Sequence, residues 1–203
     1  MITIIDYSIN NLWSVQTALE SLNIKYLVTN KEKDILNSSH IILPGVGSFK
    51  TAMESIKELK IDENIRAAAS NNTKILGICL GMQLLGLKGY EDGETKGIGL
   101  IDSEIKKFKL DGINKIPHIG FNTVYSKNSG LLFKNLDKFN DFYFVHSYVM
   151  SITSVNQDII IHNCQNGENF IAAFEYNNIC GTQFHPEKSQ TNGLKLLYNF
   201  YNS

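Results

Sequence analysis

A cysteine flanked by glycines is the first feature of this sequence that could do chemistry. Cys79 stands in Gly77-Ile78-Cys79-Leu80-Gly81, a G-x-C-x-G pattern between an apolar run and a segment with helical spacing. This is the cysteine form of the nucleophile elbow, whose glycines allow a sharp strand-to-helix turn that lifts the nucleophile out of the core. The helix N-terminus would favour the thiolate, and the N–H of Leu80 would stabilise an oxyanion. The alternative is a buried cysteine between small residues that only permit close packing.

A thiol nucleophile needs a base, and the segment GTQFHPE at residues 181–187 offers one. Pro186 biases His185 toward an extended conformation, and residues two apart in an extended segment project to the same side. Glu187 could therefore hold the His185 imidazole in the tautomer that accepts the thiol proton. The alternative is an ordinary surface ion pair at the end of a strand.

A glycine-rich loop, PGVG at residues 44–47, follows a third predicted strand. Its glycines allow backbone N–H groups to face a developing oxyanion, although a plain tight turn would need the same residues. The segments at Pro44, Cys79 and His185 all follow predicted strands, and the ligand crevice of an open α/β sheet lies beyond the carboxyl ends of its strands. We therefore expect these three segments to meet there.

The remaining cysteines, Cys164 and Cys180, give the chain an odd total of three, with no C-x-x-C pair and no partner histidine spacing. This argues against both a disulfide framework and a structural zinc. We interpret these two residues as packing, and we expect no metal and no cofactor.

The first half of the chain alternates between strand and helix patterns. Apolar runs predict strands over Ile2–Asp6, Ile24–Val28, His40–Leu43 and Lys74–Cys79. Helical spacing predicts helices after a possible cap at Asn10, over Met53–Asn72 with an interruption near Ile61-Asp62, and over about Leu80–Leu87. Such alternation implies right-handed crossovers and a parallel sheet that is covered on both faces.

The second half is dominated by strand patterns with Gly, Asn and Asp turns between them. The expected strands are Ile105–Phe108, Phe121–Tyr125, Phe142–Met150, Asp158–Asn163, Phe170–Glu175 and Ile179–Phe184, before a closing helix over about Gln190–Tyr201. We expect an antiparallel extension of the sheet or a small second sheet. The fold class is therefore α/β, a three-layer α/β/α arrangement with a mostly parallel central sheet, and residues 1–203 show no linker that would divide them.

Composition excludes several classes of function. Nineteen Lys plus Arg balance 20 Asp plus Glu for a formal net charge of −1, which gives no electrostatic reason to expect nucleic acid. No apolar run reaches the roughly 18 residues needed to span a bilayer, and the residues at the start lack a basic leader. We expect a soluble, cytoplasmic protein that contacts no membrane.

Several motifs together resemble a known family. The segments GICLGMQLL and GTQFHPEKSQ are similar to those of class I, or triad-type, glutamine amidotransferases, which have a flavodoxin-like fold. The further segments PGVGSF, PHIGFNTV and YFVHSY resemble the glutaminase subunits of imidazole glycerol phosphate synthases. The resemblance extends over nearly the whole chain, which would then be one glutamine amidotransferase type 1 domain.

The resemblance implies a role for each matching residue. Cys79 would attack the side-chain amide of glutamine, His185 would carry the proton to the leaving ammonia, and Glu187 would orient His185. A γ-glutamyl thioester would form, and water would release glutamate. The residues implied in binding glutamine, together with the oxyanion hole, are Gly45, Val46, Gly47, Leu80, Gln83, His146, Ser147 and Tyr148. A core, hydrogen-bonded histidine is the alternative interpretation of His146 and the favoured one for His118.

The resemblance also implies a partner, because ammonia that escapes into neutral water is mostly protonated and no longer nucleophilic. That partner would be a (β/α)₈-barrel cyclase subunit in a heterodimer, which uses the ammonia to form imidazole glycerol phosphate and AICAR in histidine biosynthesis. Asn11, Phe121, Tyr143 and Lys188 match family positions near the subunit interface, although they could equally be a surface charge and core aromatics. The first turn departs from the family pattern, since Ser8 and Asn10 replace glycines, and Phe121 stands where tryptophan is common.

Two other functions fit the same residues. A paralogous glutaminase would supply ammonia to a different, sugar-amidinating synthase, and the altered first turn motivates this alternative. A stand-alone γ-glutamyl cysteine hydrolase would need no partner. A catalytically dead binding module is a further alternative, which the intact set of Cys79, His185 and Glu187 disfavours.

Overall fold

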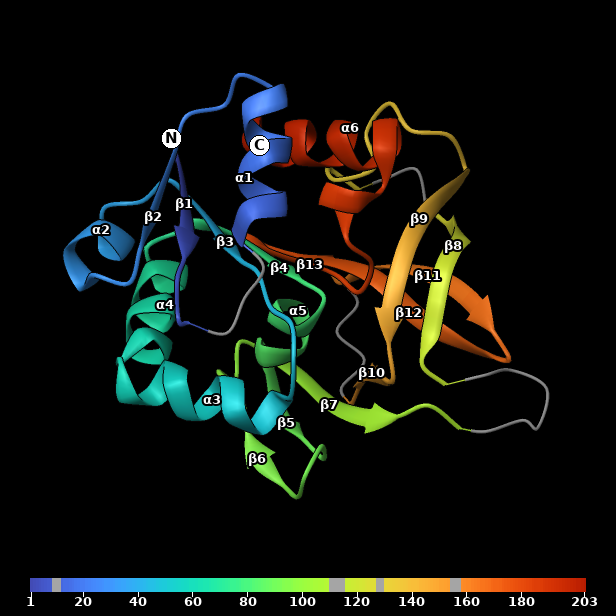
Figure 1. Ribbon diagram of the computed structural model, residues 1–203, viewed down its shortest axis with the longest axis horizontal. Coiled ribbons are helices and arrows are strands. Elements are labelled where there is room, and N and C mark those ends of the chain that lie inside the picture. Colours follow the sequence, from blue (N-terminus) through green and yellow to red (C-terminus); the bar gives the residue numbers. More distant parts are fainter. Residues whose placement is uncertain (9–11, 110–115, 127–129, 154–157) are drawn as a thin grey trace.

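The computed structural model describes residues 1–8, 12–109, 116–126, 130–153 and 158–203 (Figure 1). Its helices are α1 (Leu12–Ser21), α2 (Glu32–Leu36), α3 (Phe49–Glu58), α4 (Ile61–Ser70), α5 (Leu80–Leu84), the 3₁₀ turn η1 (Pro186–Lys188) and α6 (Gln190–Tyr201). None of the helices in this described part is long and apolar enough to cross a membrane.

A large sheet runs through the molecule in the order β2-β1-β3-β4-β13-β12-β11-β8-β9. Its strands are β1 (Ile2–Ile5), β2 (Tyr26–Thr29), β3 (His40–Leu43), β4 (Lys74–Ile78), β8 (His118–Tyr125), β9 (Phe139–His146), β11 (Ile160–Asn166), β12 (Glu168–Tyr176) and β13 (Ile179–Thr182). The strands from β2 to β13 in this order pair in parallel, and those from β13 to β9 pair antiparallel. The expected α/β fold with an antiparallel extension is confirmed.

Helices cover both faces of the parallel half, and alternate residues of the strands point to each of them. Ile42 and Leu76 pack in the core that contains residues of α1 and α6. Their neighbours Ile41 and Ile75 pack in the second core, with residues of α3 and α4. Figure 1 shows these two helix layers on opposite sides of the sheet. Because both faces are buried, these strands are continuous apolar runs rather than alternating ones.

A second sheet of four strands lies beside the large one, in the order β10-β7-β5-β6. Its strands are β5 (Gly86–Gly89), β6 (Thr95–Lys96), β7 (Ile101–Lys107) and β10 (Tyr148–Ile152). The single strand expected over Phe142–Met150 is therefore wrong, because β9 ends at His146 in the large sheet and β10 begins at Tyr148 in the second sheet. Ser147 is the point at which the chain passes from one sheet to the other.

Other boundaries also differ from the expectation. The interruption expected near Ile61-Asp62 is present and falls just before these residues, at Leu59-Lys60, where Lys60 adopts a left-handed conformation with φ of 54°. Helix α5 ends at Leu84, because Gly86 joins a strand that pairs with β7. Helix α2 and strands β5 and β6 had no counterpart in the sequence prediction. The expected cap at Asn10 lies outside the described residues.

Candidate active site

Cys79 occupies a strained turn between β4 and α5. Its backbone has φ of 53° and ψ of −109°, a region that residues with a Cβ rarely adopt and that is strained for any residue other than glycine. The turn is held because the Cys79 N–H donates to the carbonyl of Thr182 at 2.7 Å. The residue is only 7% exposed. This is the geometry of a nucleophile elbow, so the strand-to-helix turn predicted from G-x-C-x-G is confirmed.

The three predicted loop segments do leave the sheet at the same edge. Strands β3, β4 and β13 are adjacent and parallel, and Leu43 is paired with Gly77 while Thr182 is paired with Ile78. The loop after β3 packs directly on the elbow, since a Cβ on Gly81 would lie 1.8 Å from the Leu43 carbonyl oxygen. Only glycine at position 81 allows this approach.

Gly45, in the loop after β3, is equally close to the start of α5. A Cβ at Gly45 would lie 2.8 Å from the Gly81 nitrogen and 2.9 Å from Cβ of Leu80. Gly45 is buried, whereas Val46 and Gly47 are exposed. Gly47 has φ of 93°, which favours glycine. The loop therefore packs against Leu80 and Gly81, in the first turn of α5.

His185 and Glu187 form a buried pair. Nδ1 of His185 lies 2.7 Å from Oε1 of Glu187, and both side chains are 3% exposed. The sequence predicted that an extended segment would bring the two side chains together. The pairing instead arises across a turn, because Pro186–Lys188 form the 3₁₀ turn η1. The turn brings the carboxylate back to the ring, and the Ser189 hydroxyl fixes it by donating to the His185 carbonyl at 2.6 Å.

The environment of His185 favours its charged form. Burial lowers the pKa of the imidazole, but interactions with Cys79 and Glu187 outweigh burial and raise the pKa to about 10. Nε2 of the ring is buried and has no hydrogen-bond partner among the described residues. One ring nitrogen is thus held by a carboxylate while the other is available for a proton near the Cys79 thiol.

Two buried glutamine side chains connect the elbow to the second sheet. Nε2 of Gln83 donates to Oε1 of Gln183 at 3.0 Å and to the carbonyl of Tyr148 at 3.0 Å. Nε2 of Gln183 in turn lies 3.7 Å from the Cys79 sulfur. Gln83 was predicted from the sequence, whereas Gln183 was not, although its position inside the GTQFHPE motif could have indicated it.

The predicted segment His146-Ser147-Tyr148 lies at the same site. The Cys79 sulfur lies 3.9 Å from the carbonyl of Val145, the residue before it. Nδ1 of His146 lies 2.9 Å from the Tyr148 carbonyl, which closes the turn at Ser147. Burial lowers the pKa of His146 to about 3, so this ring is neutral.

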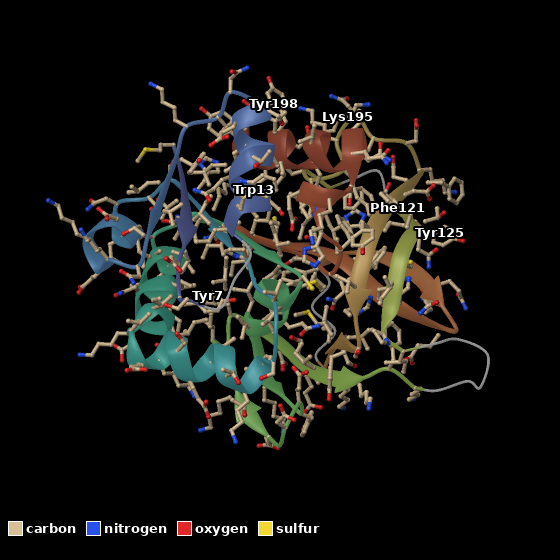
Figure 2. All side chains as sticks on the ribbon, viewed as in Figure 1. Tyr7, Trp13, Phe121, Tyr125, Lys195 and Tyr198 are labelled. Atoms are coloured by element: carbon tan, nitrogen blue, oxygen red, sulfur yellow. The ribbon has the colours of Figure 1, made fainter. Side chains whose placement is uncertain are left out.

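Two more side chains near the site were not predicted. The Tyr7 hydroxyl donates to the Pro44 carbonyl at 2.7 Å and holds the loop after β3 (Figure 2). Burial, then the charge of Cys79, raises the pKa of Tyr7. Glu91 accepts the Phe49 N–H at 2.8 Å, and its charge contributes to the raised pKa of the Tyr148 phenol, after burial. No spacing in the sequence connects either residue with Cys79.

The other two cysteines are buried elsewhere in the structure. Cys164 is fully buried and Cys180 is 7% exposed. Burial raises the pKa of the Cys164 thiol to about 12 and also raises that of Cys180. Among the described residues no group of three or more His, Cys, Asp or Glu side chains could hold a metal ion.

The residues expected at an interface lie on the outer face of β8, β9 and η1. Phe121 is 51% exposed, and its ring lies 5.6 Å from that of half-buried Tyr143 on the neighbouring strand. Lys188 is exposed. The alternative that both aromatics belong to the core is wrong. Figure 2 labels Phe121 near Tyr125, in the part of the molecule formed by β8 and β9. Asn11 lies outside the described residues.

Comparisons with known proteins agree on one family. The family model described as "Glutamine amidotransferase class-I" matches residues 3–203. The chain is 44% identical over 203 residues to "Imidazole glycerol phosphate synthase subunit HisH 1" of Parasynechococcus marenigrum (strain WH8102), covering 98% of this chain and 96% of that protein. It is 42% identical to the protein of the same name from Campylobacter jejuni (strain RM1221), with 98% of each chain covered.

A solved structure supports the fold. The crystal structure of a putative GMP synthase protein from Thermoplasma acidophilum superposes with a TM-score of 0.74 at 18% identity, covering 99% of this chain and 92% of that chain. At this identity the likeness concerns the fold alone.

Proposed function

Because the chain belongs to the class-I glutamine amidotransferases, we propose that Cys79, His185 and Glu187 are the catalytic triad with which it hydrolyses glutamine. Its relatives are named as HisH subunits of imidazole glycerol phosphate synthase, and the chain is accordingly the glutaminase subunit of this synthase in histidine biosynthesis. These names favour the histidine pathway over the sugar-amidinating alternative and over a stand-alone hydrolase.

The reaction begins with the Cys79 thiolate, which forms a bond to the side-chain amide carbon of glutamine. The carbon–nitrogen bond then breaks, and His185 gives the proton from Nε2 to the departing nitrogen, which leaves as ammonia. Water attacks the resulting γ-glutamyl thioester and passes a proton to His185. The carbon–sulfur bond breaks, glutamate leaves and the thiolate is restored. Glu187 stabilises the imidazolium that this cycle needs, through its contact with Nδ1 at 2.7 Å.

The oxyanion hole is assigned to backbone N–H groups of Leu80 and of the loop at residues 45–47. The Cys79 N–H cannot contribute, because it already donates to Thr182. Leu80 begins α5, where N–H groups have no acceptor within the helix. The close packing of Gly45 on Leu80 supports a shared site for the developing negative charge.

The α-amino and α-carboxylate groups of glutamine are assigned to a second group of residues, apart from the oxyanion hole. It consists of Gln83, the His146-Ser147-Tyr148 turn and Glu91. Nε2 of Gln83 makes two hydrogen bonds within the protein, so its Oε1 is the atom available for a substrate N–H donor. The Glu91 carboxylate, which acts electrostatically on Tyr148, is suited to the substrate ammonium.

The partner is assigned as a (β/α)₈-barrel cyclase that binds this chain as a heterodimer and receives the ammonia before it is protonated. It would dock on the outward residues of the β8–β9 pair, beside η1. These are the cross-strand pairs Ile119 and Val145, Phe121 and Tyr143, Thr123 and Asp141, and Tyr125 and Phe139. Most of them are apolar and exposed, which is typical of a protein interface. Lys188 on η1 would add a charged contact at the rim.

The observation that carries this proposal is the placement of a strained cysteine beside a buried His–Glu pair. The test is glutamate release by the chain assembled with a histidine-pathway cyclase. We expect Cys79→Ala to reduce the rate by about four orders of magnitude or more, with ammonia-dependent synthesis by the complex retained. The matched controls, Cys164→Ala and Cys180→Ala, should keep the wild-type rate. Glutamate release by Cys79→Ala at the wild-type rate would overturn the proposal.

A further inference from the structure

Two buried histidine rings from neighbouring strands bond to one another below the outer face of β8 and β9. Nδ1 of His118 lies 3.0 Å from Nε2 of His146, and the two residues are directly paired across the strands. They are 7% and 6% exposed. Neither ring belongs to the triad, and a bond between two imidazoles requires one to donate and the other to accept.

The other hydrogen bond of His146 determines which ring donates in the bond between the two histidines. Nδ1 of His146 lies 2.9 Å from the carbonyl oxygen of Tyr148, which can only accept, so Nδ1 carries the proton. Burial holds the pKa of His146 at about 3, and Nε2 of this neutral ring is therefore an acceptor. The proton between the rings must then belong to Nδ1 of His118.

The other hydrogen bond of His118, to Asn122, independently shows that His118 is the donor. Oδ1 of Asn122 accepts the Thr123 N–H at 2.8 Å, and Nδ2 donates to the Gln165 carbonyl at 2.9 Å, so the orientation of this amide is fixed. Nδ2 also lies 3.3 Å from Nε2 of His118. Since Nδ2 is a donor, Nε2 of His118 must be the acceptor and Nδ1 must carry the proton. Burial also lowers the pKa of His118.

Aromatic packing keeps both rings in these positions. His118 stacks on Phe144, with ring centroids 4.8 Å apart and an angle of 23° between the planes. Phe108 and Phe170 contact both histidine rings. A flip of either ring would turn a carbon toward its hydrogen-bond partner in a buried setting, where an unmade bond is costly.

The chain of bonds continues to the nucleophile. The Tyr148 carbonyl, which accepts from His146, also accepts from Gln83, and Gln83 bonds to Gln183 beside the Cys79 sulfur. His146 therefore holds the turn at Ser147, where the backbone passes between the two sheets. His118 holds His146.

We propose that His118 is a positioning residue for glutamine binding, which fixes the tautomer of His146 and through it the backbone of residues 146–148. This inference rests on the proposed function. Among the described residues, His118 bonds to His146 and Asn122 and to none of the triad. Removing its Nδ1–H donor should therefore loosen the turn at residues 146–148 and leave the triad in place. The effect should therefore appear in KM for glutamine more than in kcat.

The first test compares His118→Leu with His118→Asn in the assembled synthase. Leu removes the donor, whereas the Asn amide places an N–H where Nδ1 was. We expect Leu to raise KM for glutamine about tenfold, Asn to restore most of the loss, and ammonia-dependent synthesis to stay unchanged. The matched control is His162→Asn, because His162 is a buried histidine that pairs with Glu175 and not with His118 or His146. Its KM should not change.

The second test reads the tautomers directly. Ring ¹⁵N shifts should show both His118 and His146 as neutral Nδ1–H forms in the wild-type chain. Asn122→Asp replaces the amide donor by an acceptor, so His118 should change to the Nε2–H form and KM should rise. This half-buried substitution leaves the rings and their packing in place.

The outcomes separate this inference from the proposed function. A wild-type complex that does not hydrolyse glutamine overturns both. A wild-type KM in His118→Leu, an equal rise in His118→Asn or His162→Asn, or Nε2–H tautomers in the wild-type chain overturns the positioning role alone.

Discussion

The parallel half of the large sheet brings one buried histidine to the Cys79 site, and the antiparallel half brings another. His185 follows β13 and is 3% exposed, while His146 ends β9 and is 6% exposed. The pKa of His185 is raised to about 10, which favours a charged ring, and that of His146 is lowered to about 3, which keeps the ring neutral. The two residues have the same type, nearly the same burial and the same neighbourhood.

The difference lies in the partners of each ring. Glu187 and Cys79 favour a charged imidazole, whereas the Tyr148 carbonyl and the His118 ring surround an imidazole that burial keeps neutral. A ring that can hold a proton beside a thiol suits catalysis, and a ring that keeps one tautomer suits the support of a backbone turn. The first partner set comes from a short turn after a parallel strand, and the second from pairing between antiparallel strands.

Glu187→Gln should produce the largest change, because it removes the charge that favours the imidazolium of His185. We expect kcat for glutamine hydrolysis to fall by about three orders of magnitude, and the pKa of His185 to fall. The measurement is glutamate release by the assembled synthase across a range of pH. Glu175→Gln is the matched control, since Glu175 also forms a buried His–Glu contact, 3.2 Å from His162. Equal losses in both variants would contradict the assignment.

The pH dependence of stability should separate the two histidines next. The pKa of His185 is raised from 6.5 to about 10, so its stabilising contribution is complete below pH 6.5 and is lost as the pH rises to about 10. The pKa of His146 is lowered from 6.5 to about 3, so stability is lost as the pH falls through that range. Each effect is at most about 5 kcal/mol in the free energy of unfolding.

Urea unfolding at a series of pH values checks both effects. His185→Gln should flatten the alkaline side of the stability profile, and His146→Gln should flatten the acid side. If each variant flattened the opposite side, the contrast between the two rings would be wrong.

Phe121→Ala should have a smaller effect, confined to the outer face of the antiparallel half. We expect it to weaken binding of the cyclase by about tenfold, because an exposed aromatic side chain on the proposed docking surface is lost. Isothermal titration with the cyclase measures this. Leu87→Ala removes a side chain of similar exposure from β5 in the second sheet and should leave the affinity unchanged. Equal affinity for Phe121→Ala and wild type would show that the cyclase binds at another surface.

Ser8→Gly should have the smallest effect and should stabilise the parallel half. Ser8 has φ of 69° in the turn after β1, and a residue with a Cβ is strained there. We expect the free energy of unfolding to increase by about 1 kcal/mol. Its matched control is Ser21→Gly in helix α1, which should destabilise. A decrease for Ser8→Gly would show that the Ser8 side chain contributes more than the strain costs.

The sequence predicted the bounds of those strands and helices that a short residue pattern marks at both ends. Strand β3 and helix α6 begin and end at the predicted residues, because an apolar run and a helical spacing mark them. The break at Ser147 could not be predicted, since the strand pattern continues through it and the break arises from a change of sheet. Helix α2 escaped prediction because its only buried residue is Ile35.

The same distinction holds at the site. Glycine spacing around Cys79 predicted a strand-to-helix turn, and the proline after His185 predicted an extended backbone at that residue; both are present. The geometry that joins His185 to Glu187 was predicted for the wrong reason, because a 3₁₀ turn replaces the extended segment. Tyr7 and Glu91 reach the site only through tertiary packing, which no spacing in the sequence records.

If Cys79 is the nucleophile, glutamine forms a covalent intermediate on its sulfur. Acid quenching of the assembled synthase during turnover of isotope-labelled glutamine, followed by mass spectrometry of the cysteine peptides, tests it directly. We expect a γ-glutamyl group on Cys79 and on neither Cys164 nor Cys180. Turnover with no label on any cysteine, or with the label on Cys164 or Cys180, would contradict it.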